Sequence, residues 1–316
     1  AMSKLKIAVC GLGMGNAHVA GWKKHPNVEV VAACDLNRDR WEKTRKEHGV
    51  QEFFDDWEKL LAAVKPDVVS IATPNALHRA QTEAALAAGC HVLCEKPLSV
   101  SAADGRAMLA AAASAGKRLM VNFSYRFSAA SVALKRVVES GRLGRVYYAR
   151  TLWHRRRGIP GLGGWFTTKK MSGGGPLIDL GVHRLDLALW LMGCPKAEHV
   201  LATSSDVFMQ RAAKDGKSAD VEDLAAAMIS LEGGRAIALE ASWAGDGVEI
   251  ETQETRLWGD RGGLVQRNLN GGYDYEGTFF SETDGVLENS LVRPGPALAV
   301  KTAMECFADA IINGTP

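Results

Sequence analysis

The chain begins with an apolar segment that runs directly into a cluster of glycines. Residues 5–10, Leu-Lys-Ile-Ala-Val-Cys, are followed by Gly11, Gly13 and Gly15, and residues 16–25 are predicted to be helical. A short apolar run that ends in glycines is typical of a buried parallel strand and a tight turn. Backbone N–H groups at the start of a helix, with no side chains in the way, predict a phosphate-binding turn.

The glycine spacing departs from the dinucleotide-binding fingerprint, whose third glycine comes three residues after the second. That position is Asn16, and Gly15 comes one residue early. We expect the pyrophosphate of a dinucleotide to lie against backbone N–H groups over a locally shortened loop. The alternative is a tight turn without a ligand. The cofactor-binding residues expected here are Gly11, Gly13, Met14, Gly15 and Asn16.

Strands and helices alternate up to about residue 124. Apolar runs at 28–34, 66–72, 91–94 and 118–122 are separated by helical stretches. This alternation predicts βαβ units and hence a doubly wound parallel sheet of the Rossmann type. In such a sheet the carboxyl ends of the strands form the ligand-binding edge.

Asp35 ends the second predicted strand, about 24 residues after Gly11. A carboxylate at this point accepts hydrogen bonds from the adenosine ribose and repels a 2′-phosphate, which favours NAD over NADP. Arg38 and Arg40 lie close by in the sequence and keep NADP open as an alternative. Asp35 has a second possible role as a turn residue or helix cap.

Two further motifs follow the third and fourth predicted strands at the same edge. Residues 73–78 read Thr-Pro-Asn-Ala-Leu-His, where the asparagine also suits a helix cap. In Glu95-Lys96-Pro97, the lysine is placed to bind a substrate hydroxyl and favour its alkoxide, or is a solvated side chain in a proline-braced turn. The residues expected at the cofactor are Thr73, Pro74, Asn75, His78, Glu95 and Lys96, together with Asp35 and Arg38.

The pattern changes after residue 125, where strands outnumber helices. Strands joined by polar turns predict an α+β domain with a mostly antiparallel sheet. The expected domains are 1–124, 125–297 and a C-terminal segment 298–316, whose helix is expected to return to the first domain and whose end we expect to be truncated. Helices are predicted at 128–140, 178–192 and 298–312, and strands at 146–154, 197–208, 223–232, 235–244 and 248–258.

Three polar residues share one face of the helix predicted at 178–192. Asp179, His183 and Asp186 are separated by four and three residues, and they follow a run of glycines. Histidine is a suitable general base for an alcohol near neutral pH, and a carboxylate one turn away can orient it or the substrate. The alternative is a capping aspartate beside a buried core histidine.

A basic run, His154-Arg155-Arg156-Arg157, precedes a glycine-rich loop at 158–175. An arginine here would bind a carboxylate or a polyhydroxylated ligand, or would lie in solvent or at an interface. The net charge of +2 and the lack of a basic stripe argue against nucleic acid as a partner. Trp153 and Trp165 offer faces for sugar C–H groups or pack in the core.

The remaining composition favours an ordinary cytoplasmic protein. No apolar run approaches the roughly eighteen residues that cross a bilayer. The first residues lead straight into the predicted strand, so we expect no secretory signal. The six cysteines lack metal-ligand spacing, so we expect reduced thiols, no metal and no membrane partner.

Taken in order, these motifs resemble the Gfo/Idh/MocA oxidoreductases, relatives of glucose–fructose oxidoreductase and inositol 2-dehydrogenase. The matching residues are the glycine turn, Asp35, 73–78, 95–97, 122–127 and Asp179-x-Gly181-x-His183. The resemblance implies a Rossmann domain followed by an open-faced sheet, a nicotinamide cofactor, a sugar or polyol substrate, and a homodimer or homotetramer built through the sheet. It places the catalytic lysine at Lys96 and the Asp/His pair at Asp179 and His183. The expected substrate contacts are Lys96, Tyr125, Arg126, Arg156, Trp165, Asp179 and His183.

The expected reaction is hydride transfer between a secondary alcohol and the nicotinamide ring. His183 would take the hydroxyl proton, Lys96 would favour the developing alkoxide, and Asp179 would orient substrate or base. Two alternatives keep the cofactor: an NAD-dependent glycoside-cleaving enzyme that oxidises its sugar transiently, and a non-catalytic NAD-binding regulator.

Overall fold

The computed structural model describes residues 4–247 and 249–315, which divide into two compact units. One unit contains the residues up to Phe123 together with those from Lys301 onward, and the other is Ser124–Val300. Each unit has its own sheet and its own hydrophobic core, so the two are described separately.

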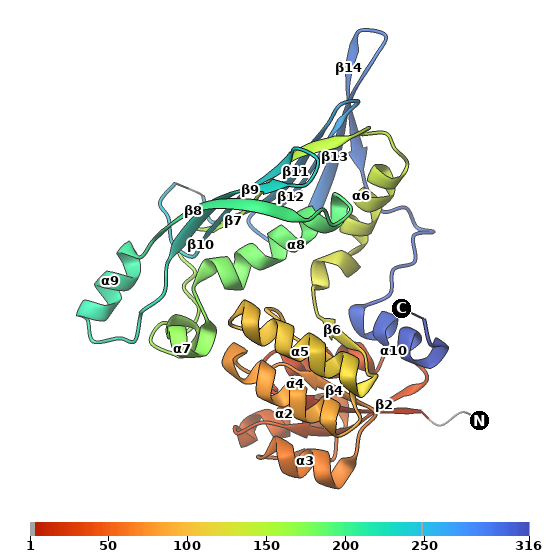
Figure 1. Cartoon of the computed structure of the whole chain (residues 1–316), viewed down its shortest axis with the longest axis vertical. Coiled ribbons are helices and arrows are strands. Elements are labelled where there is room, and N and C mark those ends of the chain that lie inside the picture. Colours follow the sequence, from red (N-terminus) through yellow and green to blue (C-terminus); the bar gives the residue numbers. More distant parts are fainter. Residues whose placement is uncertain (1–3, 248, 316) are drawn as a thin grey trace. The chain divides into compact units, whose positions relative to one another are not determined.

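The first unit is built on six parallel strands in the order β3-β2-β1-β4-β5-β6 (Figure 1). The predicted doubly wound sheet is confirmed, and its strand order reverses between β1 and β4. Ligands bind at such a reversal, beyond the carboxyl ends of the strands. The strands are β1 (Leu5–Cys10), β2 (Val28–Cys34), β3 (Glu52–Phe54), β4 (Val68–Ile71), β5 (His91–Cys94) and β6 (Leu119–Val121).

Several helices of this unit begin at a capping residue, and some of these also end at a glycine. Asn37 caps α2, Asp56 caps α3 and Ser101 caps α5, each through a side-chain oxygen that accepts backbone N–H groups. Gly49 and Gly116 end α2 and α5 in the left-handed conformation that favours glycine. The helices are α1 (Gly15–Trp22), α2 (Arg38–His48), α3 (Trp57–Val64), α4 (His78–Ala87), α5 (Ala102–Ala115) and α10 (Ala303–Asn313), with a short 3₁₀ turn, η1, at Asn75–Leu77.

Small apolar side chains fill the core between this sheet and its helices. Cys10, Cys34, Cys90 and Cys94 are buried there among alanine, valine and leucine side chains. All six cysteines of the chain lie in the described part and are free thiols. The buried cysteines therefore act as small core residues.

Helix α10 packs against α1 within the first unit. Its Phe307 ring lies 6.4 Å from the Trp22 ring, and Asp309 accepts a hydrogen bond from His25 at 3.2 Å. A capping box between Thr302 and Glu305 starts this helix. The sequence prediction placed a helix at 298–312, and the observed helix starts later, after its cap.

The second unit is built on eight strands in the order β14-β13-β12-β11-β7-β10-β9-β8. Only the central β7–β10 pair is parallel among the described strands of this sheet, so the predicted mostly antiparallel sheet is confirmed. The strands are β7 (Val146–Arg155), β8 (Ala197–Ser205), β9 (Leu224–Leu231), β10 (Arg235–Ser242), β11 (Glu251–Gly259), β12 (Gly263–Asn268), β13 (Tyr275–Thr283) and β14 (Val286–Val292).

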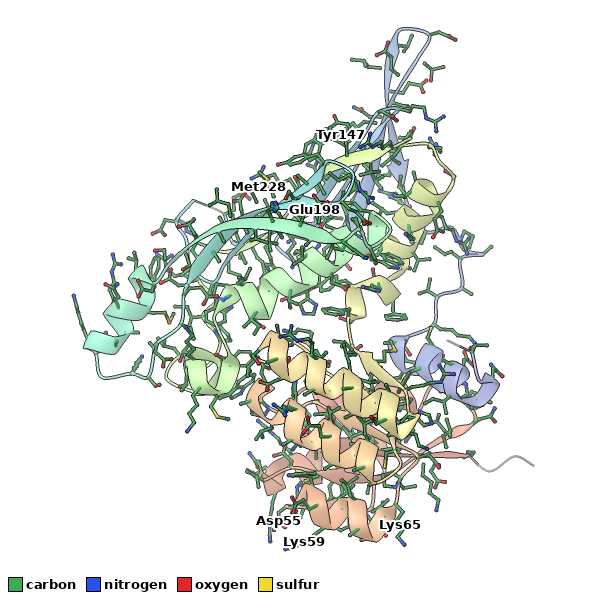
Figure 2. All side chains as sticks on the ribbon, viewed as in Figure 1. Asp55, Lys59, Lys65, Tyr147, Glu198 and Met228 are labelled. Carbon is green, nitrogen blue, oxygen red and sulfur yellow. The ribbon has the colours of Figure 1, made fainter. Side chains whose placement is uncertain are left out.

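Helices α6 (Ala129–Glu139) and α8 (Val182–Leu191) lie on one face of this sheet (Figure 1). Thr151 of β7 donates a hydrogen bond to the Arg184 carbonyl at 3.2 Å, which fixes α8 over the central strand. Met228 lies in register with Arg150, across β10, on the opposite face of the sheet, where it is 46% exposed (Figure 2). No helix in the described part of the chain is long and apolar enough to span a bilayer.

The structure corrects the predicted elements of the second unit in three places. The strand predicted at 197–208 ends at Ser205, and α9 (Val207–Lys214) follows because the Asp223 carboxylate accepts the N–H groups of Phe208 and Met209. The helix predicted at 178–192 begins with a π-helical segment, η4, at Leu177–Gly181. Strands β12 to β14 were not predicted: β12 is short, with a buried centre of only three residues, β13 carries few apolar side chains, and β14 is almost entirely exposed.

We predict that Gly11→Ala is much more destabilising than Gly49→Ala. Gly11 has a φ of +86°, and an added Cβ would lie 2.4 Å from the Ala72 carbonyl oxygen. Gly49 has a φ of +72° but faces open space. In urea unfolding, the free energy of unfolding should fall by about 1 kcal/mol for Gly49→Ala and by about 3 kcal/mol or more for Gly11→Ala. Equal losses would show that the Ala72 contact is not a constraint.

Candidate active site

The glycine turn is anchored by Asp35 at the end of β2. The Asp35 carboxylate accepts the Leu12 N–H at 2.6 Å and the Asn37 N–H at 2.8 Å, and it forms an ion pair with Arg40 at 3.1 Å. Asp35 thus holds both the turn and the start of α2, and Asn37 is the residue that caps this helix. Its turn role and its expected cofactor role are compatible, because a carboxylate oxygen accepts more than one hydrogen bond.

Arg40 and Arg38 differ in their distance from the turn. A Cβ on Gly13 would lie 3.6 Å from the Arg40 guanidinium, so Arg40 borders the glycine turn. Arg38 is 76% exposed and lies 4.0 Å from Asp55. The sequence predicts Arg38 at the cofactor, whereas the structure brings Arg40 to the turn.

The backbone of the turn fits a dinucleotide pyrophosphate. Helix α1 starts after Met14 without any side-chain cap, which leaves N–H groups at its N-terminus for a ligand. Gly11 passes Ala72, and a Cβ on Gly15 would lie 2.9 Å from Val9. The Asn16 side chain is tied to α2, where it bonds with Glu47 at 2.7 Å and Thr44 at 3.0 Å. Asn16 therefore offers its backbone to the turn.

His78 lies behind the ligand-binding edge and joins two of its loops. Its ring nitrogens lie 2.8 Å from the Pro97 carbonyl and 3.0 Å from the Thr73 carbonyl, and the side chain is fully buried. Burial lowers the pKa of His78, although the two carbonyls oppose this shift. The Thr73 hydroxyl donates to Gln81 at 2.7 Å. His78 is thus placed to position the loops that carry Thr73 and Lys96.

A buried polar network supports Glu95 at the end of β5. Glu95 accepts hydrogen bonds from His18 at 2.8 Å and from Asn122 at 2.6 Å, and its second oxygen accepts the Lys96 N–H at 3.1 Å. His18 in turn bonds with Ser70 of β4 at 2.8 Å. Burial alone would raise the pKa of Glu95, but the hydrogen bonds and charge of His18, with Asn122 and Lys96, lower it.

Glu95 is therefore a buried carboxylate held charged by α1 and β6. It fixes the backbone from which Lys96 extends. His18, Ser70 and Asn122 were not predicted from the sequence, because these residues are far apart in the chain and meet only after the sheet forms. The Asn122 amide oxygen is buried and accepts no hydrogen bond within the described residues.

The second unit carries Asp179 and His183 on one continuous helical segment. Asp179 of η4 accepts a hydrogen bond from the Trp243 indole at 3.0 Å. His183 lies in the first turn of α8. Two rings flank it, Tyr125 at 5.1 Å and Trp153 at 5.8 Å between ring centres. These contacts place the imidazole in an aromatic wall with a carboxylate one turn before it.

Asp186 is turned to a different partner. Its two oxygens accept hydrogen bonds from Arg126 at 2.8 and 2.5 Å, a bidentate pair. Burial raises the pKa of Asp186, and Arg126 only partly opposes this shift. Arg126, which the sequence analysis placed at the substrate, has an ion-pair partner in this structure.

Strand alternation decides which arginine of the basic run faces the aromatic wall. Trp153 and Arg155 are two residues apart on β7 and share a face. Arg155 lies 3.3 Å from Glu251, donates to the Tyr273 hydroxyl at 3.1 Å and stacks over Trp153 at 5.4 Å. Arg156 is 53% exposed and lies 3.8 Å from Asp246. The structure therefore brings Arg155 to the wall, whereas the sequence analysis selected Arg156.

Burial, the largest single effect, lowers the pKa of Arg155, but Glu251, Tyr273 and Asp179 together outweigh burial and raise this pKa. Trp165, the other aromatic residue expected at the substrate, stacks on Phe166 at 3.8 Å within the glycine-rich loop. The loop is held by Glu222, whose carboxylate accepts the Gly175 N–H at 2.8 Å and the Leu177 N–H at 3.2 Å. Glu222 was also missed, because nothing in the local sequence links it to this loop.

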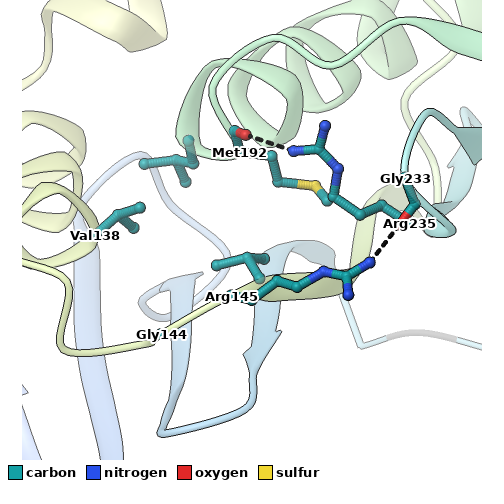
Figure 3. Close-up of a pocket in the computed structure, with 8 residues that line it drawn as sticks. Val138, Gly144, Arg145, Met192, Gly233 and Arg235 are labelled. Carbon is teal, nitrogen blue, oxygen red and sulfur yellow. Dashed lines mark hydrogen bonds between the residues drawn. The ribbon is translucent and has the colours of Figure 1, made fainter.

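A cavity of about 450 Å³ lies elsewhere in the second unit, beside the ends of α6 and α8 (Figure 3). Arg235 donates to the Met192 carbonyl at 3.3 Å, and Arg145 donates to the Gly233 carbonyl. The two guanidinium groups therefore cap backbone carbonyls, so we assign this cavity no ligand. In the described part of the chain, no three His, Cys, Asp or Glu side chains are arranged to hold a metal ion.

Comparison with protein families matches both units. Residues 5–123 match the model described as "Oxidoreductase family, NAD-binding Rossmann fold", and residues 131–265 match the "GFO/IDH/MocA C-terminal domain". The chain belongs to the GFO/IDH/MocA family. It is therefore an oxidoreductase that uses NAD, as predicted from the sequence.

Relatives with a described activity are similar over most of the chain. The D-glucoside 3-dehydrogenase of Escherichia coli (strain K12) is 35% identical and aligns with 83% of this chain and 77% of its own length. The 1,5-anhydro-D-fructose reductase of Ensifer adhaerens is 32% identical over 76% of this chain and 69% of its own. A structure of levoglucosan dehydrogenase with NADH and levoglucosan has a TM-score of 0.86, 25% identity and coverage of 99% and 91%.

We predict that Asp35→Ala shifts the cofactor preference toward NADP. The change removes the carboxylate that we expect to face the ribose. It also releases Arg40, which then has no carboxylate at 3.1 Å and can pair with a 2′-phosphate. The ratio of kcat/KM for NADP to that for NAD should rise by about tenfold or more.

Two variants control this experiment. In Asp35→Ala with Arg40→Met, the gain with NADP should disappear, since the guanidinium is gone. Asp55→Ala, which alters only the exposed partner of Arg38, should leave the ratio unchanged. A ratio that stays constant in Asp35→Ala would contradict the assignment of Asp35 to the adenosine ribose.

We predict that Glu95→Gln is destabilising at neutral pH and much less so in acid. The lowered pKa of Glu95 contributes stability above the unfolded-state value of about 4.3, and this contribution is lost as the pH falls through the lower folded-state value. In urea unfolding at pH 7, the free energy of unfolding of Glu95→Gln should be about 1–3 kcal/mol lower than that of the parent protein. This difference should become smaller below about pH 4. Glu83→Gln, in an exposed pair with Arg79, should cost under about 0.5 kcal/mol. A decrease in the free energy of unfolding that is the same at every pH would show that Glu95 does not stabilise the fold through its charged form.

Proposed function

We propose that the protein is an NAD-dependent dehydrogenase that oxidises a secondary alcohol of a sugar, an inositol or a related polyol. The names of its relatives support this substrate class: one acts on a D-glucoside, one on 1,5-anhydro-D-fructose and one on myo-inositol. The inositol relative, from Thermotoga maritima, is 29% identical over 69% of this chain. The reverse reduction of a ketone uses the same groups.

The observation that carries the proposal is the surrounding of His183. A base for a sugar hydroxyl needs an acceptor nitrogen, a polar group to orient the ring or the hydroxyl, and apolar surface for the C–H face of the sugar. Asp179 comes one turn before His183, and Trp153 and Tyr125 provide the aromatic surface beside it. A purely structural histidine does not need this combination.

Each residue has a distinct role in the proposed reaction. Bound NAD supplies the nicotinamide ring that accepts the hydride. His183 takes the proton of the reacting hydroxyl, and the Lys96 ammonium stabilises the developing alkoxide. Asp179, held by Trp243, orients the base or a neighbouring hydroxyl. Arg155 adds donors for the other hydroxyls of the substrate.

Two other functions within this cofactor class remain distinguishable. An enzyme that cleaves glycosides through transient oxidation would release a sugar without net NADH. A non-catalytic regulator would bind NAD but oxidise no polyol, and its lysine, aspartate and histidine would serve no purpose. The presence of Lys96, Asp179 and His183 in one chain favours the dehydrogenase.

We further propose that the protein is a cytoplasmic homodimer or homotetramer that associates through the open face of the second sheet. The exposed apolar side chains of Leu201 and Met228, which pair across β8 and β9, support such an interface. Six free cysteines suit a reducing compartment.

We predict that Lys96→Ala binds NAD but turns over about 10²- to 10⁴-fold more slowly. The test is a screen of aldoses, cyclic polyols and glycosides with NAD, in which nicotinamide absorbance reports turnover and protein fluorescence reports NAD binding. Lys59→Ala, which changes an exposed lysine of α3 (Figure 2), should match the parent protein. Near-full turnover by Lys96→Ala would refute the role of Lys96, and sugar release without NADH would favour the glycoside-cleaving alternative.

A further inference from the structure

Arg184, the residue after His183, is a fully buried cation. Its guanidinium donates to the Gln253 amide oxygen, to the Tyr275 hydroxyl at 3.0 Å and to the Gln266 amide oxygen at 3.5 Å. All three acceptors are neutral. Within the described residues, no carboxylate lies in ion-pair distance of Arg184, and its Nε atom has no hydrogen-bond partner. A buried charge without a counter-ion is costly, so this one requires an explanation.

The nearest carboxylate of this hydrogen-bond network is separated from Arg184 by an amide. Gln253, itself fully buried, accepts from Arg184 and donates through its nitrogen to Glu251 at 3.2 Å. The Glu251 carboxylate also accepts from the Trp153 indole and pairs with Arg155 at 3.3 Å. The negative charge of Glu251 is therefore directed at Arg155, and Arg184 keeps its positive charge uncompensated.

The charge of Arg184 lies against the same rings that flank His183. Its guanidinium carbon is 4.6 Å from the centre of the Tyr125 ring and 5.3 Å from that of Trp153. The imidazole centre lies 5.1 and 5.8 Å from these two rings. The distances through Tyr125 limit the separation of guanidinium and imidazole to less than about 10 Å.

We propose that Arg184 is a positioning residue whose uncompensated charge keeps His183 unprotonated and ready to accept the substrate proton. This inference rests on the proposed role of His183 as the base. Two positive charges within 10 Å repel each other in the protein interior, so the neighbouring cation opposes protonation of the imidazole. At an effective dielectric constant of about 20, the effect amounts to about one pH unit. The hydrogen bonds of Arg184 to Tyr275 and Gln253 also hold the aromatic wall in place.

The other charged and titratable groups around the imidazole stay the same when Arg184 is changed. They come from every element of the second unit that packs against this wall. They are Tyr125 before α6, Arg155 on β7, Asp179 on η4, Asp186 on α8, Glu251 on β11, and Tyr273 and Tyr275 at β13. A difference in the protonation midpoint of His183 between the parent protein and an Arg184 variant therefore reports the effect of the Arg184 charge.

The experiment compares Arg184→Met, Arg184→Lys and Gln253→Glu in the full chain. The acid limb of the pH profile of kcat/KM for sugar oxidation should move up by about one pH unit in Arg184→Met, because protonation of His183 is no longer opposed. Gln253→Glu should shift it in the same direction with Arg184 still present, since the new carboxylate neutralises the cation. The acid limb of Arg184→Lys should stay within a few tenths of a pH unit of that of the parent protein, because the positive charge is kept.

A control and a second measurement keep the result independent of folding and of the catalytic assignment. Arg256→Met removes a cation that pairs with Glu254 at 3.3 Å, and it should leave the acid limb unchanged. If Arg184→Met does not fold by circular dichroism, Gln253→Glu carries the test. NMR titration of the His183 ring, assigned with His183→Gln, reports the protonation midpoint without any turnover.

A midpoint that rises by about one unit in both charge-altering variants supports the proposal. If that midpoint rises while the acid limb of kcat/KM stays fixed, Arg184 acts as proposed and His183 is not the base, so the proposed function alone fails. A midpoint that is unchanged in Arg184→Met and in Gln253→Glu overturns the proposal.

Discussion

The first unit depends on the close passage of the Gly11 backbone beside the Ala72 carbonyl. A Cβ on Gly11 does not fit between the ends of β1 and β4, because it would lie 2.4 Å from the Ala72 carbonyl oxygen. This contact joins the two strands where the sheet reverses its order, and it directs the glycine turn into α1. Asp35 then fixes the turn by accepting the Leu12 N–H. The phosphate-binding geometry therefore follows from backbone packing, which explains why Asn16 can replace the third glycine of the fingerprint.

The sequence was sufficient to predict five of the six strands of the first unit, because each of these is a compact apolar run close to predicted helices. It missed β3, whose three residues Glu52–Phe54 are too few to form such a run. Glu95 was also identified, because it follows such a run. Its partners were not, since His18, Ser70 and Asn122 lie on three elements that become neighbours only when α1, β4 and β6 assemble. The residues that are expected to contact a ligand follow local motifs in the sequence, whereas the residues that position them depend on tertiary contacts.

The second unit shows the same limit more strongly. Asp179 and His183 were recognisable from helical spacing, but Arg155 was missed in favour of Arg156 although strand alternation places Arg155 on the face of Trp153. Strand β14 is almost entirely exposed and β13 carries few apolar side chains, so no clear hydrophobic period marks them. The burial of Arg184 contradicts every compositional expectation for arginine, and only the structure reveals it.

Two buried charged residues, Glu95 in the first unit and Arg184 in the second, have opposite kinds of hydrogen-bond partners. In the first unit, the Glu95 carboxylate accepts hydrogen bonds from His18, Asn122 and the Lys96 N–H. These bonds satisfy its charge and fix the backbone at Lys96. In the second, Gln253 stands where a carboxylate would neutralise Arg184. An anchoring group needs its charge satisfied, because unsatisfied polar atoms would loosen the loop that it holds. A charged group that opposes protonation of a neighbour must instead stay without a counter-ion, so that its electrostatic effect is not cancelled. Neutral hydrogen-bond acceptors satisfy N–H groups of a buried arginine and leave its charge uncompensated.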